Sequence, residues 1–338
     1  MTKEKLSKVL SDLPSGKLTY TLRNDYMFKA VLQKNRRALK GLLCALLGYN
    51  EYQIRDIELL NPIELGKAVD DKTCILDLKL IMNNDTILNI EMQVNRLDNW
   101  PERSLLYLCR AFDHLERGAD YSEIHTTMHI SILDFHLPHL TPRFYSEFKM
   151  LNTINHEVYS DKIALHVLDL KVIEELNNSG CEPLEAILAW DYPSGTASES
   201  VISTKYSELY KWAKLFKATT WEELKQMAED NEYIADTIVT YHELSDDEKI
   251  QMQCEARERY DHDKATYIKT GFRMGREEGE RIGREEGERV GRAEGQRQGI
   301  ERLSALISCL EQDGHPDLII KAAQDEALRD KLFKQYHL

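Results

Sequence analysis

The sequence has 338 residues, enough for one catalytic domain of roughly 150 to 200 residues plus smaller accessory regions. With 42% hydrophobic residues and only 8 Pro and 16 Gly, its composition excludes a disordered or fibrous chain. The first residues carry no apolar signal segment, and no run approaches the roughly 18 apolar residues of a membrane span, so we expect a cytoplasmic protein.

The formal net charge is -14, which is unusual for a protein that binds phosphate groups through Lys and Arg. The charge is unevenly distributed, however. Residues 1–48 hold ten Lys or Arg against three acids, a local net charge of +7. A local basic face therefore remains compatible with the acidic total.

The chain begins with a predicted α/β region. A helix capped by Asn24 or Asp25 is expected to run over 25–47, followed by a short strand at 54–60. Two segments of alternating polarity, 74–82 and 86–94, flank Asn83-Asn84-Asp85 and predict a hairpin with a three-residue loop.

A helix opened by Pro101 and ended by Gly118, then a buried strand at 126–135, complete an αβββαβ order. Further strands are expected at 144–151 and 162–172. A helical region over 198–264 follows, with a capping box from Ser245 to Glu248. These elements suggest an α/β domain at 1–195, a helical annex at 196–265, a charged glycine-repeat segment at 266–300 and a small helical cap at 301–338.

The predicted hairpin places two carboxylates side by side. With the three-residue loop, Asp77 is expected opposite Glu91 and Lys79 opposite Asn89, all on one face of the sheet. Directly opposed Cβ atoms lie about 4.5 to 5.5 Å apart, so both carboxylates could bind one divalent cation. Two interpretations stand at this point, a metal site and a solvated polar face of a sheet.

The stretch Ile75–Gln93 resembles the catalytic hairpin of the Rpn family of recombination-promoting nucleases and transposases, within the PD-(D/E)XK superfamily. NDYMFKAV at 24–31, Arg103 with Tyr107, HISILDF at 129–135, the LSDDEK helical region and the glycine-repeat tail are similar to this family in the same order. The resemblance extends over about 18–299. It implies a restriction-endonuclease-like mixed sheet followed by an α-helical C-terminal region.

The resemblance also implies an activity and its residues. The chain would be a Mg²⁺-dependent DNA endonuclease, with Mn²⁺ or Ca²⁺ as other candidate cations, low sequence specificity and a link to recombination or mobile elements. Asp77 and Glu91 would be the metal ligands, and Gln93 stands where the superfamily usually has lysine, which would orient the attacking water. Asp25 resembles an acid that some members place near the metal, but it also suits a helix N-terminus.

Three further residues are candidates for substrate contacts. Lys79 lies on the polar face of the hairpin, and Arg103 and Tyr107 share one face of the following helix, from which they could reach phosphate or brace the carboxylates. A solvated helix face would give the same spacing. Five histidines between 114 and 139 lack a standard zinc spacing, so zinc is not expected there.

Eight glycines recur at every fourth position of the tail, between Glu/Arg-rich spacers: Gly271, Gly275, Gly279, Gly283, Gly287, Gly291, Gly295 and Gly299. Glycine costs a helix about 1 kcal/mol relative to alanine, so this segment is expected to be weakly helical by itself. It would be either a tail that forms a homodimer or binds a partner, or a flexible charged spacer.

Two other functions compete with the DNA nuclease. Gln93 and the acidic balance favour a catalytically weak or inactive nuclease fold that acts as a DNA-binding or regulatory module, including one that serves in phage defence. A ribonuclease with the same core is the other, since the sequence does not distinguish RNA from DNA.

Overall fold

The computed structural model describes residues 9–61, 78–115, 117–177, 183–191, 199–229 and 231–338. The chain divides into two compact units, Met1–Asp261 and His262–Leu338. The expected α/β domain and all but the last four residues of the expected helical annex, 196–265, fall within the first unit.

The first unit is built on a six-stranded mixed sheet in the order β1-β2-β3-β4-β6-β5. β3 and β4 are parallel, as are β4 and β6, and the other neighbours are antiparallel. The strands are β1 (Ile57–Leu59), β2 (Leu78–Met82), β3 (Thr86–Gln93), β4 (Thr126–Leu133), β5 (Tyr145–Leu151) and β6 (Val158–Asp169). The mixed sheet and the helices that follow it confirm the predicted fold class.

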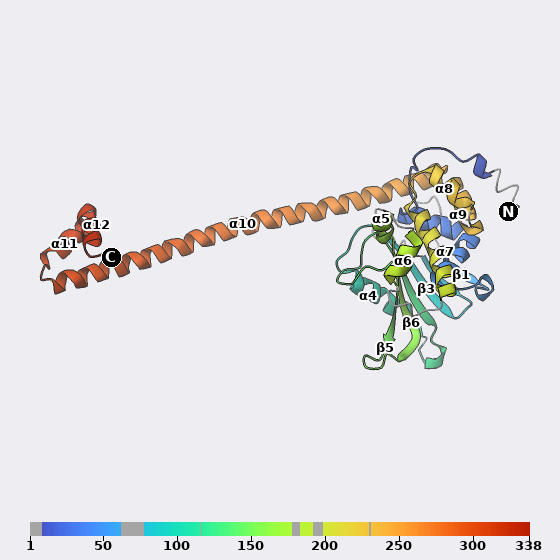
Figure 1. Cartoon of the computed structure of the whole chain (residues 1–338), viewed down its shortest axis with the longest axis horizontal. Helices are drawn as coiled ribbons and strands as arrows, with labels where there is room; N and C mark the ends of the chain where they lie inside the picture. Colours follow the sequence, from blue (N-terminus) through green and yellow to red (C-terminus); the bar gives the residue numbers. More distant parts are fainter. Residues whose placement is uncertain (1–8, 62–77, 116, 178–182, 192–198, 230) are drawn as a thin grey trace. The chain divides into compact units, whose positions relative to one another are not determined.

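Helices cover both faces of the sheet (Figure 1). The helices of the first unit are α2 (Asp25–Lys34), α3 (Arg36–Leu47), α4 (Trp100–Phe112), α5 (Lys171–Asn177), α6 (Pro183–Asp191), α7 (Glu199–Lys217), α8 (Trp221–Ala228) and α9 (Glu232–Ser245), with short 3-10 turns η1 (Glu51–Gln53) and η2 (Tyr121–Glu123). Both units include part of α10 (Glu248–Gln312), and the second adds α11 (Asp317–Gln324) and α12 (Glu326–Gln335).

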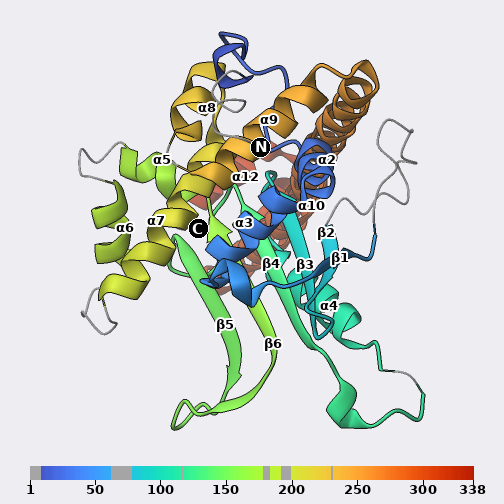
Figure 2. The same ribbon diagram turned by 90° about the vertical axis from the view of Figure 1, so that its right-hand side faces the viewer.

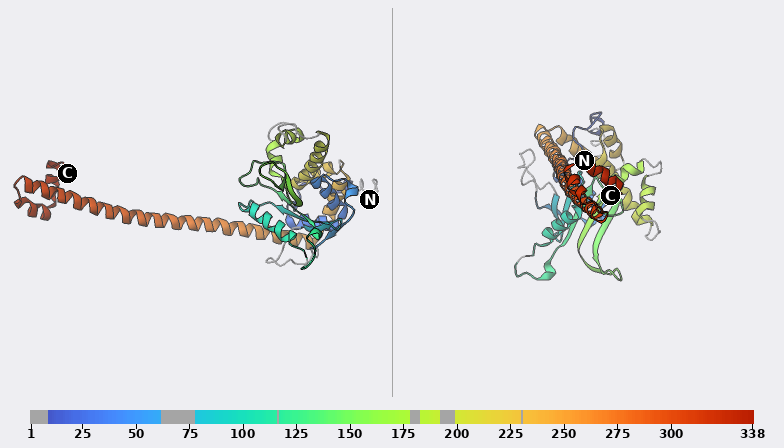
Figure 3. Two further views of the ribbon diagram at one scale, coloured as in Figure 1. Left: turned by 90° about the horizontal axis from the view of Figure 1, so that it is seen from below. Right: turned by 90° about the vertical axis from the view of Figure 1, so that its left-hand side faces the viewer.

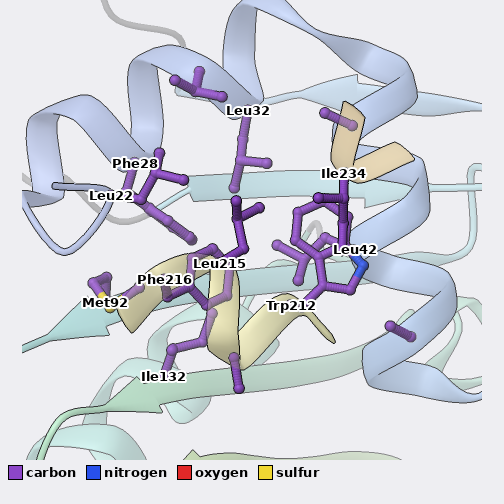
Figure 4. Close-up of a cluster of buried hydrophobic side chains, with 14 of the residues drawn as sticks. Leu22, Phe28, Leu32, Leu42, Met92, Ile132, Trp212, Leu215, Phe216 and Ile234 are labelled. Atoms are coloured by element: carbon purple, nitrogen blue, oxygen red, sulfur yellow. The ribbon is translucent and has the colours of Figure 1, made fainter. Parts of the chain in front are cut away.

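The main hydrophobic core lies between α2, α3, α7 and α9 and the even-numbered positions of the central strands. Leu42 of α3, Trp212 of α7 and Ile132 of β4 all belong to this core, part of which is drawn in the close-up in Figure 4. The opposite face of the sheet is covered by α4, whose Trp100 packs against Leu133 of β4 and Val167 of β6. Side chains at alternate positions of one strand therefore enter two different environments.

Three predicted helix boundaries were wrong. The first helix breaks at Asn35, whose side chain accepts hydrogen bonds from the amides of Arg37 and Ala38 and so starts α3. The helix after Pro101 ends at Phe112, six residues before Gly118. The predicted capping box is not formed, because Ser245 is the last residue of α9. Asp247 caps α10 instead, since its side chain accepts hydrogen bonds from the amides of Lys249 and Ile250.

Strands β5 and β6 extend beyond the rest of the sheet. β6 pairs with β4 only from Ile163 onward, so its first residues pair with β5 alone, and the two strands project as a hairpin arm (Figure 2). Six large apolar side chains of this arm are exposed, namely Phe148, Met150, Leu151, Ile154, Val158 and Tyr159.

Helix α10 continues without interruption through the glycine repeat (Figure 3). This finding contradicts the expected weak helicity and the flexible spacer. Eight Arg–Glu pairs at i,i+3 or i,i+4 spacing follow the helix from Arg273 to Glu301 and bridge its successive turns. At each of the eight glycines, an added Cβ would meet no atom of the described chain within 4 Å.

The second unit has a small core of its own. Leu306 and Leu310 near the end of α10 pack with Ala322 of α11 and Leu332 of α12. In the part of the chain that the structure describes, no helix is long and apolar enough to cross a membrane.

Candidate active site

The candidate site lies on the sheet face beneath α4. The described part of the hairpin has the predicted register, with Leu78 opposite Ile90 and Lys79 opposite Asn89. Asp77 lies outside the described residues, so its place opposite Glu91 stays a prediction. Both faces of β3 are buried, and Glu91 is only 6% exposed. The solvated-face interpretation is therefore wrong for this strand.

Glu91 is held by Arg103 from α4. The Arg103 Nη2 atom donates to Oε1 of Glu91 at 2.6 Å, and the Glu91 side chain is 8% exposed against 33% for Arg103. The guanidinium group also lies 5.6 Å from the Trp100 ring centroid and 5.1 Å from that of Tyr107. These rings come from the preceding and following turns of α4, so they fix the cation over the carboxylate.

A second polar pair lies next to Glu91 and was not chosen from the sequence. Asn89 and His129 face each other across β3 and β4, with Asn89 Nδ2 3.1 Å from Nδ1 of His129. Burial, together with the nearby charge of Arg103, lowers the pKa of His129 to about 3, so this imidazole is neutral at physiological pH. Its ring contacts those of both Trp100 and Tyr107, whose centroids are 6.3 and 6.2 Å away.

Ser131 completes this polar patch. It is 1% exposed and pairs with Glu91 in the parallel register of β3 and β4. Its Oγ atom, Oδ1 of Asn89 and Nε2 of His129 have no hydrogen-bond partner in the described chain. Such buried atoms indicate a place for water or an ion. The sequence signal was the alternation of HISILDF, which put His129 and Ser131 on one face but did not show which face.

Two other predicted site residues contact groups other than Glu91. Gln93 donates through Nε2 to the backbone oxygen of Asn95 at 2.8 Å. Asp25 pairs with Arg257 of α10 at 2.7 Å, while Asn24 supplies the cap of α2. Burial raises the pKa of Asp25 to about 6, although the Arg257 charge lowers it. The described contacts of Asp25 are thus those of a packed ion pair.

The donor set suits a hard divalent cation. Glu91 supplies a carboxylate and Ser131 a hydroxyl oxygen with no partner in the described chain, and Mg²⁺ prefers oxygen ligands. No group of three or more His, Cys, Asp or Glu side chains that could hold a metal occurs among the described residues, which do not include Asp77. His114 and His125 contact each other, and His136 pairs with Asp169 and Glu175.

The mixed sheet with helices on both faces defines an α/β protein, and its hairpin presents a buried carboxylate to an arginine on the following helix. A family model described as PD-(D/E)XK nuclease family transposase matches residues 22–271. This span is well over half of the chain, so the protein belongs to that family. No curated protein and no solved structure matches the chain.

Proposed function

We propose that this protein is a Mg²⁺-dependent endonuclease that hydrolyses phosphodiester bonds of DNA with low sequence specificity, in recombination or the movement of mobile elements. The observation that carries the proposal is the buried Glu91–Arg103 pair on the sheet face beneath α4. A carboxylate held there without a catalytic use would cost stability, because a buried ion pair often stabilises less than an apolar pair of the same volume. Membership of a nuclease family supports the same conclusion.

Glu91 and Asp77 would hold the cation, and Ser131 lies opposite Glu91 to position a water molecule or the ion. When bound, Mg²⁺ would lower the pKa of a water molecule and offset the charge that develops on the phosphate. Arg103 keeps the Glu91 carboxylate oriented and adds positive charge beside the reacting phosphate. Lys79, half-buried on β2 opposite Asn89, and Tyr107 would contact the substrate.

Gln93 is proposed to help orient the attacking water through hydrogen bonds, since an amide cannot supply the charge of a lysine. Its present contact with Asn95 is a single hydrogen bond at the end of β3, and a side-chain rotation would release it. The same contact favours the competing function, a catalytically weak module that binds DNA or regulates a partner.

The proposal is tested by incubating the full chain with supercoiled plasmid and Mg²⁺ or Mn²⁺, with EDTA as a control. We expect nicking that Asp77→Ala, Glu91→Ala and chelation each abolish. Glu102→Ala removes an exposed acid of α4 and serves as the matched control, so it should leave nicking unchanged. Bound but uncut DNA in every preparation would refute the nuclease and favour the inactive module. A parallel assay on RNA of the same sequence tests the choice of substrate.

We also propose that two copies associate through the exposed glycine repeat of α10 between Gly271 and Gly299, whose glycines wind gradually around the helix because a period of four exceeds the 3.6 residues of one turn. Small residues allow two helices to approach closely, and no described atom covers these positions. Light scattering of the full chain should give the mass of a dimer, and Gly283→Leu should return the mass of a monomer. A monomeric wild-type protein would refute this proposal without affecting the nuclease.

A further inference from the structure

Three polar side chains beside Glu91 are buried without enough hydrogen bonds. Asn89 is 3% exposed, His129 0% and Ser131 1%. The Oδ1 atom of the first, Nε2 of the second and Oγ of the third have no hydrogen-bond partner in the described chain. Burial of a polar atom without a partner lowers stability, so these three residues indicate a bound group that makes up for the loss.

The strand register places the three atoms around one point. Asn89 of β3 pairs with His129 of β4. Two residues further along the same strands, and on the same face, Glu91 pairs with Ser131. Neighbouring strands are about 4.8 Å apart and alternate residues about 6.6 Å, a spacing that one bridging water molecule spans. A buried water molecule makes about three hydrogen bonds, one for each of the three atoms.

The contact with Asn89 decides which nitrogen of His129 carries the proton. Asn89 Nδ2, which can only donate, lies 3.1 Å from Nδ1 of His129. Nδ1 must therefore accept, and in the neutral imidazole the proton lies on Nε2. The rings of Trp100 and Tyr107 contact the imidazole and hinder its rotation, so Nε2 is a hydrogen-bond donor of fixed direction.

We propose that His129 is a positioning residue for the cation of the candidate site and acts through one buried water molecule shared with Asn89 and Ser131. The proposal rests on the proposed nuclease function, because it assumes that Glu91 holds the cation. His129 donates from Nε2 to the water molecule, which in turn donates to Oδ1 of Asn89 and to Oγ of Ser131.

This water molecule fixes the hydroxyl group of Ser131. It occupies one lone pair of Oγ, so that the other lone pair is directed towards Glu91, the residue opposite Ser131 in the register. An oxygen of fixed direction then lies beside the carboxylate, and Mg²⁺ prefers oxygen ligands. Groups that orient a metal ligand in this way typically contribute about 10- to 100-fold to metal affinity.

The test measures the affinity of the full chain for Mn²⁺ by isothermal titration calorimetry, which requires neither substrate nor cleavage. His129→Asn removes the donor at the position of Nε2 and should weaken Mn²⁺ binding about 10- to 100-fold. His129→Gln should keep the wild-type affinity, because the amide nitrogen of Gln reaches the position of Nε2, whereas that of Asn reaches only the position of Nδ1. Both variants exchange the ring for an amide, so a role in packing alone would make them alike.

Ser131→Ala should weaken Mn²⁺ binding by a similar factor. Because both residues act through the same water molecule, the His129→Asn/Ser131→Ala double variant should lose no more affinity than either single variant. Thr127→Val is the matched control, since Thr127 is 0% exposed on the same face of β4 and its hydroxyl group donates to the backbone oxygen of His125. It should bind Mn²⁺ as the wild type does, and thermal unfolding of each variant checks that the fold is intact.

Equal weakening by His129→Asn and His129→Gln, or losses that add in the double variant, would overturn the proposal. Wild-type affinity in His129→Asn would do the same. If Glu91→Ala then still abolished Mn²⁺ binding, the proposed function would stand without this role of His129. A wild-type protein that bound no Mn²⁺ would refute the metal site and the role of His129 together.

Discussion

Replacing Arg103 by methionine should destabilise the protein by leaving the Glu91 carboxylate buried without its cation. The Glu91 side chain is 8% exposed and the two groups are 2.6 Å apart, whereas Arg103 is 33% exposed. Breaking a fully buried pair costs about 3 to 5 kcal/mol, and partial exposure of the guanidinium group reduces this value to about 2 to 4 kcal/mol. For a domain of this size, such a loss corresponds to a fall of about 4 to 16 °C in the melting temperature.

The assay is thermal unfolding of the single and double variants, with and without Mg²⁺. In Arg103→Met, the buried Glu91 carboxylate has lost its cation. Glu91→Gln removes that negative charge, so the Arg103→Met/Glu91→Gln double variant should be more stable than Arg103→Met alone. A cation bound by Glu91 would replace the lost positive charge, so Mg²⁺ should raise the melting temperature of Arg103→Met more than that of the wild type.

Arg110→Met is the matched control, because Arg110 is an exposed arginine near the end of the same helix. It should unfold at the wild-type temperature. If Arg103→Met unfolded at the same temperature as Arg110→Met, the charge balance inferred for Glu91 would be refuted. If only the Mg²⁺ effect were missing, the ion pair would stand and the metal site would be refuted.

Three other outcomes are expected. Asn35→Ala should cost about 1 to 3 kcal/mol in urea unfolding, because it removes the α3 cap and hydrogen bonds to Asp236 and Thr240 of α9; an unchanged midpoint would mean that water replaces them. The folded pKa of Asp25, about 6, lies above its ordinary value of 3.8, so its ionisation removes up to about 3 kcal/mol of stability as pH rises from 4 to above 6. Asp25→Asn should therefore unfold at a higher urea concentration than the wild type at pH 8 but not at pH 4, and parallel curves would contradict this. If only solvent surrounds Gly279, Gly279→Ala should stabilise the helix by about 1 kcal/mol and raise the helix content measured by circular dichroism. A fall in helix content together with a loss of dimer mass would instead place a second chain against Gly279.

The hairpin could be predicted because its loop fixes its register. With three residues between the strands, the pairing of Lys79 with Asn89 followed by counting alone. The helix break at Asn35 could not be predicted in the same way, because the apolar stripe continues through α2 and α3. Asn35 ends one helix and caps the next through its Oδ1 atom, while its Nδ2 atom donates to α9, more than 200 residues later in the sequence.

The polar patch beside Glu91 shows a different limit. The strand that contains His129 and Ser131 was predicted, but the position of these two residues next to Asn89 and Glu91 depends on how α4 returns the chain to the sheet. That parallel pairing is a tertiary contact which no local pattern reports. The same holds for Asp25, whose partner Arg257 lies on α10.

Glu91, Arg103 and Ser131 belong to β3, α4 and β4, which follow one another in the chain with the short turn η2 before β4, and this arrangement has a consequence for how the site opens. Contacts between neighbouring elements form with little loop-closure cost, so this segment is expected to fold and to fluctuate as one cooperative unit. In native-state hydrogen exchange, the amides of α4 and the central residues of β3 and β4 should then exchange with a common opening free energy. A nucleic acid bound to this face would slow all of them together.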